Sequence, residues 1–264
     1  MSVAVCADPS GDARLHQVAE ALAQELGLPL VLCSKPGDAT LLLVVRPERL
    51  ELRVVRGELA GGRPIFVDLL AMDVQSPAGR RVRQPIARAV GLVARKEAGK
   101  PLPVVIDATA GFGEDAWLLA SLGCRVIAIE RSPIMAALLQ DGLRRAASQM
   151  PDIAQRIELR IGNSIELLSR CEPVDVIYLD PMFPTGRKTL ERKPMRVLRA
   201  LVGADTDAEA LLRAAQATGT HRVVVKRPLR SPPLGNLKPH VTHEGRALRF
   251  DVYVRNVECP MTKK

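Results

Sequence analysis

Three acidic residues, Asp107, Glu130 and Asp180, each end an apolar segment that has the composition of a β-strand. Ligands of open α/β sheets bind outside the carboxyl ends of the strands, so residues that end strands are the first candidates for chemistry. One acid at such a position is as often a solvated loop residue. Three at the same edge of a sheet favour a binding site.

A glycine turn, Asp-Ala-Thr-Ala-Gly-Phe-Gly-Glu-Asp-Ala, covers residues 107–116. Gly111 and Gly113 allow backbone amides to approach a ligand closely where a helix begins. Counted from Gly111, the segment satisfies the G-x-G-x-x-A dinucleotide fingerprint, and Glu130 lies 19 residues further on, where a ribose-binding acid is expected. An NAD-dependent oxidoreductase is therefore one hypothesis.

Counted from Asp107, the same turn resembles the D-x-G-x-G-x-G turn of Rossmann-like S-adenosylmethionine methyltransferases, with Thr109 in place of the first glycine. An acid at position 107 can position the loop or contact the cationic methionine end of that cofactor. In an NAD enzyme, Glu114 and Asp115 would place negative charge at the helix N-terminus that must receive a pyrophosphate. The turn therefore favours the methyltransferase hypothesis.

A second motif, Asp-Pro-Met-Phe-Pro, follows the apolar segment Val-Ile-Tyr-Leu and covers residues 180–184. It resembles the D/N-P-P-Y/F motif of methyltransferases that act on exocyclic or amide nitrogens. An aromatic amine is a poor nucleophile because its lone pair is delocalised into the ring. Asp180 and the carbonyl of Pro181 can accept its N–H bonds and localise the lone pair, while Phe183 stacks on the base. The alternative is a strand followed by a proline turn with a core phenylalanine.

Motifs along nearly the whole chain resemble the ribosomal RNA small subunit methyltransferase J family of bacterial enzymes. They stand in the same order as in that family and cover residues 47–53, 107–113, 119–126, 180–184, 193–203, 222–228 and 249–253. The resemblance implies methyl transfer from S-adenosylmethionine to the exocyclic N2 of one guanosine in 16S rRNA. It implies cofactor contacts by Glu114, Asp115, Glu130, Arg131, Asn163, Ser164 and Asp180, beside those expected of Asp107, Gly111 and Gly113 from the glycine turn.

A third hypothesis, of a different class, is a catalytically silent RNA-binding assembly factor that keeps the fold without the reaction. The intact pair of Asp180 and Phe183 argues against it, because binding alone requires neither an amine acceptor nor a stacking ring in this motif.

The net charge of +9, from 38 basic and 29 acidic residues, is concentrated late in the chain. Residues 185–200 hold six basic and one acidic side chain, residues 221–264 hold ten and three, and the rest of the chain is slightly acidic. A basic face favours a polyanionic partner, here 16S rRNA or the small ribosomal subunit. Aromatic residues, at 3%, are too few for a stacking platform. The expected RNA contacts are Arg187, Lys188, Arg192, Lys193, Lys226 and Arg227.

A small N-terminal α/β domain is expected over residues 1–75. Apolar and β-rich runs predict strands over residues 2–6, 30–33, 40–46, 51–56 and 65–70. Apolar residues at helical spacing predict a helix over residues 12–26, which Gly27 ends.

The second domain, residues 76–264, alternates strands and helices, which predicts a parallel sheet covered by helices. The fold class is α/β, and the resemblance implies a Rossmann-like class I S-adenosylmethionine-dependent methyltransferase fold. We expect strands over residues 104–107, 125–130, 157–161, 174–180, 222–226 and 247–254, the last one antiparallel to its neighbour. We expect helices over residues 85–94, 115–121, 133–147, 164–169 and 205–217.

The five cysteines are odd in number, scattered and without a C-x-x-C pair, which argues against a disulfide framework or a zinc site. His240 and His243 form H-x-x-H without a third ligand, so no metal is expected. No apolar run approaches the roughly 20 residues that cross a bilayer, and residues 1–10 lack the pattern of a secretory signal. A cytoplasmic enzyme without a membrane partner is expected.

Overall fold

The computed structural model describes residues 1–77, 79, 84–182, 193–203 and 206–255. Its N-terminal part is a three-stranded sheet of β1 (Val3–Ala7), β2 (Leu41–Val45) and β3 (Leu50–Val54). β1 pairs parallel with β2, which pairs antiparallel with β3. Nearly all of these strand residues are buried, and alternate residues of β1 and β2 enter two different hydrophobic clusters, one on each face of the sheet.

Helix α1 (Ala13–Leu26) joins β1 to the rest of the N-terminal sheet. The side chain of Asp12 accepts hydrogen bonds from the backbone N–H groups of Arg14 and Leu15 and so caps the first turn. Gly27 ends the helix in the left-handed conformation at φ 64°. The predicted helix and its glycine stop are confirmed.

The predictions of strands over residues 30–33 and 65–70 are wrong. Leu30 and Ile65 make only isolated bridges, to Val5 and Leu52 respectively. The chain turns between Leu32 and Lys35, and the second segment passes into the short 3₁₀ helix η1 (Leu69–Ala71). Neither segment stays beside its neighbour long enough to build a ladder of hydrogen bonds.

The structure contains a disulfide between Cys6 of β1 and Cys33, with a Cα–Cα distance of 5.5 Å. The scattered cysteines argued against any disulfide framework, and the structure corrects this expectation for one pair. The two residues are 27 positions apart in sequence, and they meet because Val31 donates a backbone hydrogen bond to Val5 beside them. Cys124 and Cys171 are free thiols.

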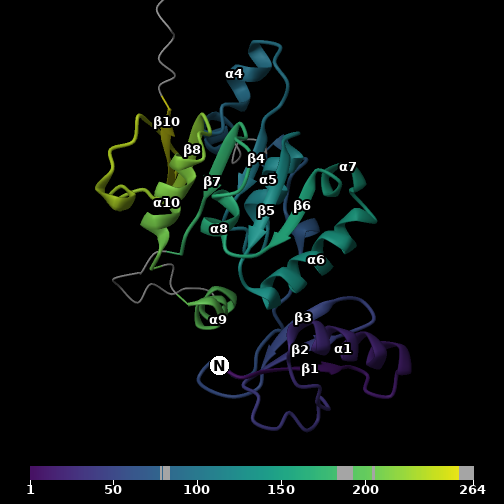
Figure 1. The fold of residues 1–264 in the computed structure, drawn as a ribbon. Helices are drawn as coiled ribbons and strands as arrows, with labels where there is room; N and C mark the ends of the chain where they lie inside the picture. Colours follow the sequence, from purple (N-terminus) through teal and green to yellow (C-terminus); the bar gives the residue numbers. More distant parts are fainter. Residues whose placement is uncertain (78, 80–83, 183–192, 204–205, 256–264) are drawn as a thin grey trace, which may run out of the picture.

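The larger sheet has seven strands in the order β6-β5-β4-β7-β8-β10-β9 (Figure 1). The strands are β4 (Val104–Asp107), β5 (Arg125–Glu130), β6 (Ile157–Ile161), β7 (Val176–Leu179), β8 (Arg222–Pro228), β9 (Val241–Glu244) and β10 (Leu248–Val254). β4 to β8 pair in parallel, and β10 runs antiparallel to both β8 and β9. The predicted parallel sheet with an antiparallel last strand is confirmed.

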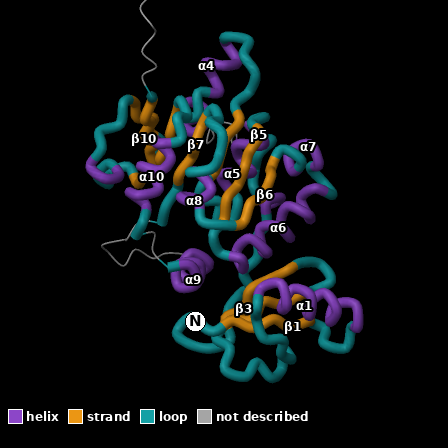
Figure 2. Tube along the Cα trace, in the orientation of Figure 1, coloured by secondary structure: helices purple, strands orange, loops and turns teal. Residues whose placement is uncertain are grey.

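Helices cover both faces of this sheet (Figure 2). Alternate residues of one strand enter different cores, as Val176 and Ile177 of β7 do. The first face packs against α3 (Gln84–Ala89), α5 (Glu114–Ser121) and α6 (Pro133–Ala147), and the second against α8 (Ser164–Leu168) and α10 (Ala208–Ala217). The chain is therefore an α/β protein with a doubly covered sheet.

Four features of the larger part differ from the sequence expectations. The helix expected over residues 85–94 is two helices, α3 and α4 (Leu92–Glu97), because Gly91 takes φ 74° between them. The short α7 (Pro151–Ala154) and α9 (Lys193–Val202) were not expected. His243 and Glu244 belong to β9 instead of a turn, and the turn begins at Gly245. The short η2 (Leu234–Asn236) precedes β9.

Helix α6 packs against both sheets, and Figure 1 shows the N-terminal sheet beside it. The carboxylate of Asp141 on α6 accepts the backbone N–H of Leu50 at 3.1 Å. A Cβ on Gly142 would lie 2.4 Å from Cγ1 of Val67, so only glycine allows this close approach. The small sheet lies within residues 1–75 and the large one within 76–264, while the boundary at residue 75 stays a prediction.

Candidate functional site

The acids singled out in the sequence meet at the carboxyl edge of the seven-stranded sheet. Asp107 ends β4 and Glu130 ends β5, while Asp180 directly follows β7. In the ladder between β7 and β8 the last pair is Leu179 with Val225, so Asp180 and Lys226 come next, side by side. From β4 the chain continues to β5 and β6 on one side of the sheet and then returns to β7 and β8 on the other side of β4. Open α/β sheets form their ligand crevice where the strand order reverses in this way.

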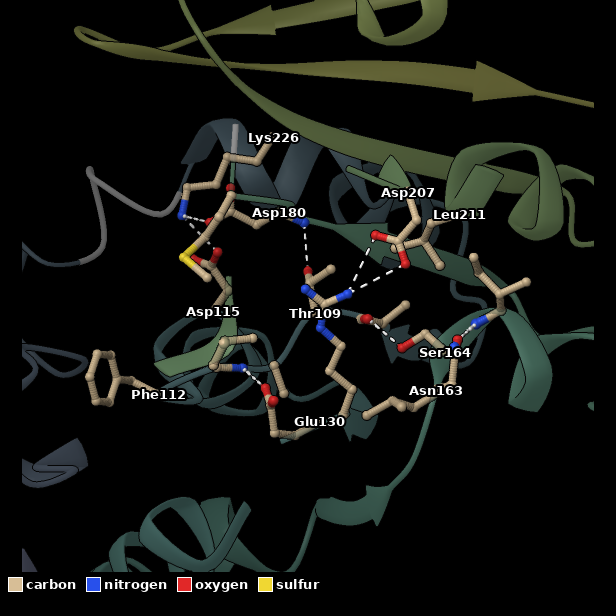
Figure 3. A pocket seen from close by; sticks show the side chains of 18 of the residues that line it. Thr109, Phe112, Asp115, Glu130, Asn163, Ser164, Asp180, Asp207, Leu211 and Lys226 are labelled. Atoms are coloured by element: carbon tan, nitrogen blue, oxygen red, sulfur yellow. Dashed lines mark hydrogen bonds and ion pairs between the residues drawn. The ribbon is translucent and has the colours of Figure 1, made fainter. Parts of the chain in front are cut away.

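A cavity of about 340 Å³ opens at this edge (Figure 3). Its volume lies in the range of pockets that take small molecules and cofactors. Its lining comes from the glycine turn, from the ends of β5, β7 and β8, and from the starts of α8 and α10. The polar and charged lining residues are Thr109, Glu114, Asp115, Glu130, Arg131, Asn163, Ser164, Asp180, Asp207 and Lys226.

The glycine turn needs both of its glycines. Gly111 and Gly113 have φ values of 53° and 76°, where side chains with a Cβ are strained. A Cβ on Gly113 would also lie 2.3 Å from Cδ1 of Leu139, so this glycine allows α5 to begin against α6. Gly111 lines the cavity, whereas Gly113 shapes the turn from behind.

Asp107 lies beneath the turn and is 1% exposed. It accepts a hydrogen bond from the backbone N–H of Thr109 at 3.1 Å and is not among the residues that line the cavity. Burial, followed by the nearby charge of Asp115, raises the pKa of Asp107 to about 8. Of the two roles expected for this acid, the geometry matches positioning of the loop.

Thr109 connects the two sequence motifs. Its hydroxyl accepts the backbone N–H of Asp180 at 2.7 Å, across 71 residues of sequence. In the sequence Thr109 stood out only as a departure from the glycine pattern. Because β4 and β7 are neighbours in the sheet, a hydroxyl at this position reaches the start of the Asp-Pro-Met-Phe-Pro segment. The residue thus orders the backbone of Asp180.

Glu130 holds the turn from the neighbouring strand. Its two carboxylate oxygens accept the backbone N–H groups of Gly111 at 2.8 Å and Ser132 at 2.7 Å. Ser132 in turn caps α6, since its hydroxyl accepts the backbone N–H of Met135. Glu130 therefore fixes the glycine turn and the start of α6 at the cavity wall, a role that sequence spacing alone did not indicate.

The opposite wall carries three of the expected residues and one unexpected acid. Asn163 caps α8 by accepting the N–H of Ile165 at 2.9 Å, and the hydroxyl of Ser164 donates to the carbonyl of Ala108 at 2.6 Å. Arg131 lies 3.4 Å from the carboxylate of Asp207, which precedes α10. Asp207 could have been found only from the tertiary structure, because nothing in its local sequence connects it with β5.

The floor of the cavity is a cluster of three charged side chains, from α5, from β8 and from the residue that follows β7. The Lys226 ammonium lies 2.7 Å from a carboxylate oxygen of Asp115 and 2.9 Å from one of Asp180. The same Asp115 oxygen accepts the Tyr178 hydroxyl at 2.8 Å. Figure 3 shows Lys226, Asp115 and Asp180 converging on one side of the cavity. Burial and the charge of Asp115 raise the pKa of Tyr178 well above its ordinary value, so Tyr178 acts as a donor.

The expected RNA contacts are placed as follows. Lys226 lies in the cavity floor, and Arg227 is 5% exposed and donates to the carbonyl of Pro232, so these two face protein groups. Lys193 is the first residue of α9. Three other expected RNA contacts, Arg187, Lys188 and Arg192, lie outside the described residues. The catalytic candidate Phe183 also lies outside them.

The described residues also bear on metal binding and on membrane insertion. In the part of the chain that the structure describes, no group of three or more His, Cys, Asp or Glu side chains is arranged to hold a metal ion. None of the described helices is long and apolar enough to cross a bilayer.

Comparisons with known proteins give the class. A family model described as a putative S-adenosylmethionine-dependent methyltransferase matches residues 22–255. A solved structure of an S-adenosylmethionine-dependent methyltransferase from Neisseria gonorrhoeae is 31% identical with a TM-score of 0.68, covering 98% of this chain and 99% of the other. The fold and the cavity therefore define an S-adenosylmethionine-dependent methyltransferase.

The most similar relatives include a protein from Coxiella burnetii (strain Dugway 5J108-111), 45% identical over 93% of this chain and 94% of its own. Another, from Aeromonas hydrophila, is 48% identical over 89% of this chain and 92% of its own. Both carry the name ribosomal RNA small subunit methyltransferase J. This chain belongs to that family, as the sequence motifs indicated.

The cavity residues fit the cofactor of this family. The charged side chains that line the cavity give it a net negative charge. They are the five acids Glu114, Asp115, Glu130, Asp180 and Asp207 and the two cations Arg131 and Lys226. S-adenosylmethionine carries a sulfonium and an ammonium group, which such a lining attracts. A pyrophosphate would meet Glu114 and Asp115 at the start of α5, as the sequence argument against NAD required.

Proposed function

We propose that this enzyme transfers a methyl group from S-adenosylmethionine to the exocyclic N2 of one guanosine in 16S rRNA, and that it works in the cytoplasm on RNA or on the small ribosomal subunit. The main structural support is the placement of Asp180 at the cavity. Its backbone N–H donates to the hydroxyl of Thr109, and its carboxylate pairs with Lys226. The names of the relatives support the RNA substrate.

Asp180 and the carbonyl of Pro181 accept the N–H bonds of the target amine. This localises the nitrogen lone pair toward the methyl group, in line with the bond that breaks. Bound S-adenosylmethionine supplies an electrophilic methyl group on a sulfonium. The amine proton leaves during or after the transfer. Phe183 stacks on the guanine once it has left its neighbours, and this residue stays a prediction outside the described part of the chain.

The cofactor lies along the cavity wall that contains Glu130. The Glu130 carboxylate binds the ribose hydroxyls, and the acids at the start of α5, Glu114 and Asp115, face the cationic methionine end. The remaining proposed cofactor contacts are Asp107 through the loop, Gly111, Gly113, Arg131, Asn163, Ser164 and Asp180. Arg187, Lys188, Arg192 and Lys193 stay the proposed RNA contacts, since they follow the Asp-Pro-Met-Phe-Pro segment directly.

The test is transfer of a tritiated methyl group from S-adenosylmethionine to 16S rRNA, offered as naked RNA, as an assembling particle and as the mature subunit. Nuclease digestion and mass spectrometry of the product should show N2-methylguanosine at one position. RNA with inosine at that position lacks the N2 amine and should take no methyl group. Label on a ring nitrogen, or on the inosine RNA, would contradict the proposed acceptor.

Calorimetry and the methyl-transfer assay test the other two hypotheses. Calorimetry should show binding of S-adenosylmethionine and none of NADH, because the acids at the start of α5 repel a pyrophosphate. An assembly factor without activity would bind the RNA but transfer no label to any of the three substrates.

A further inference from the structure

Lys226 occupies an unusual position for a basic residue of this chain. It lies within strand β8, and its side chain is only 18% exposed. Its ammonium is within hydrogen-bond distance of two carboxylates, Asp115 at 2.7 Å and Asp180 at 2.9 Å. These carboxylates come from the start of α5 and the end of β7, so a single cation joins the wall beside the glycine turn to the Asp-Pro-Met-Phe-Pro segment.

We propose that Lys226 is a positioning residue for methyl transfer: it holds the carboxylate of Asp180 in the orientation that receives the target amine. The inference rests on the proposed function, because it assumes that Asp180 accepts the N–H of that amine. Thr109 orders the backbone of Asp180 and Lys226 orders its carboxylate, so the acceptor is fixed at both ends before the RNA binds.

The charges around Asp180 show why an ammonium is needed there. The carboxylates of Asp115 and Asp180 both act electrostatically on Asp107, and both contact the same ammonium, so the three acids lie close together. Like-charged carboxylates repel, so without Lys226 the side chain of Asp180, which is 37% exposed, would turn away from Asp115 toward solvent. The ammonium between them replaces this repulsion by two attractive contacts.

The chemistry of Lys226 excludes two other roles. Burial opposes its charge, but the carboxylates of Asp115 and Asp180 outweigh this effect and raise the pKa of Lys226 above its ordinary value. It therefore keeps its proton and is no general base for the amine. Its contacts are directed into the cavity floor, which also leaves it unsuited to bind an RNA phosphate.

The experiment compares Lys226→Met, which keeps a long side chain without its charge, with Lys226→Arg, which keeps the charge. Lys96→Met is the matched control, because it makes the same change at an exposed lysine of α4 that is not among the residues lining the cavity. The measurements are single-turnover methyl transfer at saturating RNA and cofactor, the KM for RNA, calorimetric affinity for S-adenosylhomocysteine, and thermal unfolding.

Lys226→Met should lower the single-turnover rate about 100-fold, the size of effect that a misplacement of roughly 1 Å produces. The KM for RNA and its salt dependence should stay as in the wild type. Lys226→Arg should recover at least about tenfold of the loss, and Lys96→Met should stay within about threefold of the wild type. The affinity for S-adenosylhomocysteine should change far less than the rate, since Asp115 keeps its place on α5.

A Lys226→Met rate within about threefold of the wild type would overturn the inference, and so would equal rates for the Met and Arg variants. A weaker RNA affinity with a salt slope reduced by about 0.7–0.9 would assign Lys226 to a phosphate instead. If Lys226→Met does not fold, Lys226→Gln and Lys226→Arg give the same comparison. An inactive wild type would refute the proposed function, whereas active Lys226 variants refute only this inference.

Discussion

The chain contains two clusters of charged side chains that are built on opposite principles. In the N-terminal sheet, Asp8 and Glu51 are surrounded by three arginines, Arg46, Arg49 and Arg53, at 2.7–2.8 Å. In the cavity, acids outnumber cations by five to two. With Glu48, 3.6 Å from Arg46, the first cluster holds three acids and three arginines, while the second has an excess of negative charge that a cationic ligand can balance.

The burial of the two clusters differs in the same sense. Glu51 is 1% exposed and each of its oxygens accepts from an arginine, so this cluster has the form of a structural ion network. Asp115 and Asp180 remain 20% and 37% exposed, toward the cavity. Charged groups that are paired within the protein neutralise one another, whereas charged groups in excess at a cavity mark a candidate site for a ligand.

The comparison predicts the largest effect for Asp180→Asn. The amide keeps the size of the side chain but loses the charge that localises the amine lone pair, so methyl transfer should fall about 10³-fold. RNA affinity, which depends mainly on phosphate contacts, should not change. Single-turnover rates and filter binding at constant salt measure the two quantities. A rate within tenfold of the wild type would show that Asp180 only binds.

Glu130→Ala should have the next largest effect. It removes the acceptor for the N–H groups of Gly111 and Ser132 and the proposed acceptor for the ribose hydroxyls. Hydrogen bonds to charged groups contribute about 1.5–3 kcal/mol each, so cofactor affinity should fall roughly 10- to 100-fold. Calorimetry with S-adenosylhomocysteine measures this loss, with Glu166→Ala on the exposed side of α8 as the control. Unchanged affinity in a folded variant would remove Glu130 from the cofactor site.

Glu51→Gln tests the structural cluster. The loss of its charge leaves Arg49 and Arg53 beside a neutral amide, and the free energy of unfolding should fall by about 1–3 kcal/mol, less than for a fully buried pair because both arginines are about one-third exposed. Methyl transfer by the folded enzyme should stay within twofold. Urea unfolding measures the change, and Glu48→Gln, at an exposed partner of Arg46, should change stability by less than about 0.5 kcal/mol. Reduced activity without reduced stability would contradict the division between the clusters.

Asp107→Asn should change the pH dependence of stability and little else. Burial and the charge of Asp115 raise the pKa of Asp107 from 3.8 to about 8, so the folded state binds its proton more tightly than the unfolded state. Stability from this group is therefore present below pH 3.8 and is lost as the pH rises toward about 8. The asparagine, which keeps the acceptor for Thr109, should show a flatter profile in urea unfolding between about pH 4 and pH 9. Parallel profiles for the two proteins would contradict this origin of the pH dependence.

The sequence determined the local elements of the site. The strands that end in Asp107 and Glu130 have the predicted bounds, as does helix α6. These elements are long apolar or amphipathic runs with clear end signals, such as the Ser132 cap and Pro133 at the start of α6. Because parallel strands end at one edge of a sheet, the sequence also predicted which acids would meet.

Only the tertiary structure decided which of these residues contact one another. Thr109 and Asp180 are 71 residues apart, and Lys226 and Asp115 are 111 apart. Such pairs depend on the order and register of strands that are distant in sequence, which no local pattern encodes. The same reason explains the unexpected Cys6–Cys33 disulfide and the pairing of Arg131 with Asp207. The charge of Lys226 was visible in the sequence, but its partners were decided by its place on β8 beside the end of β7.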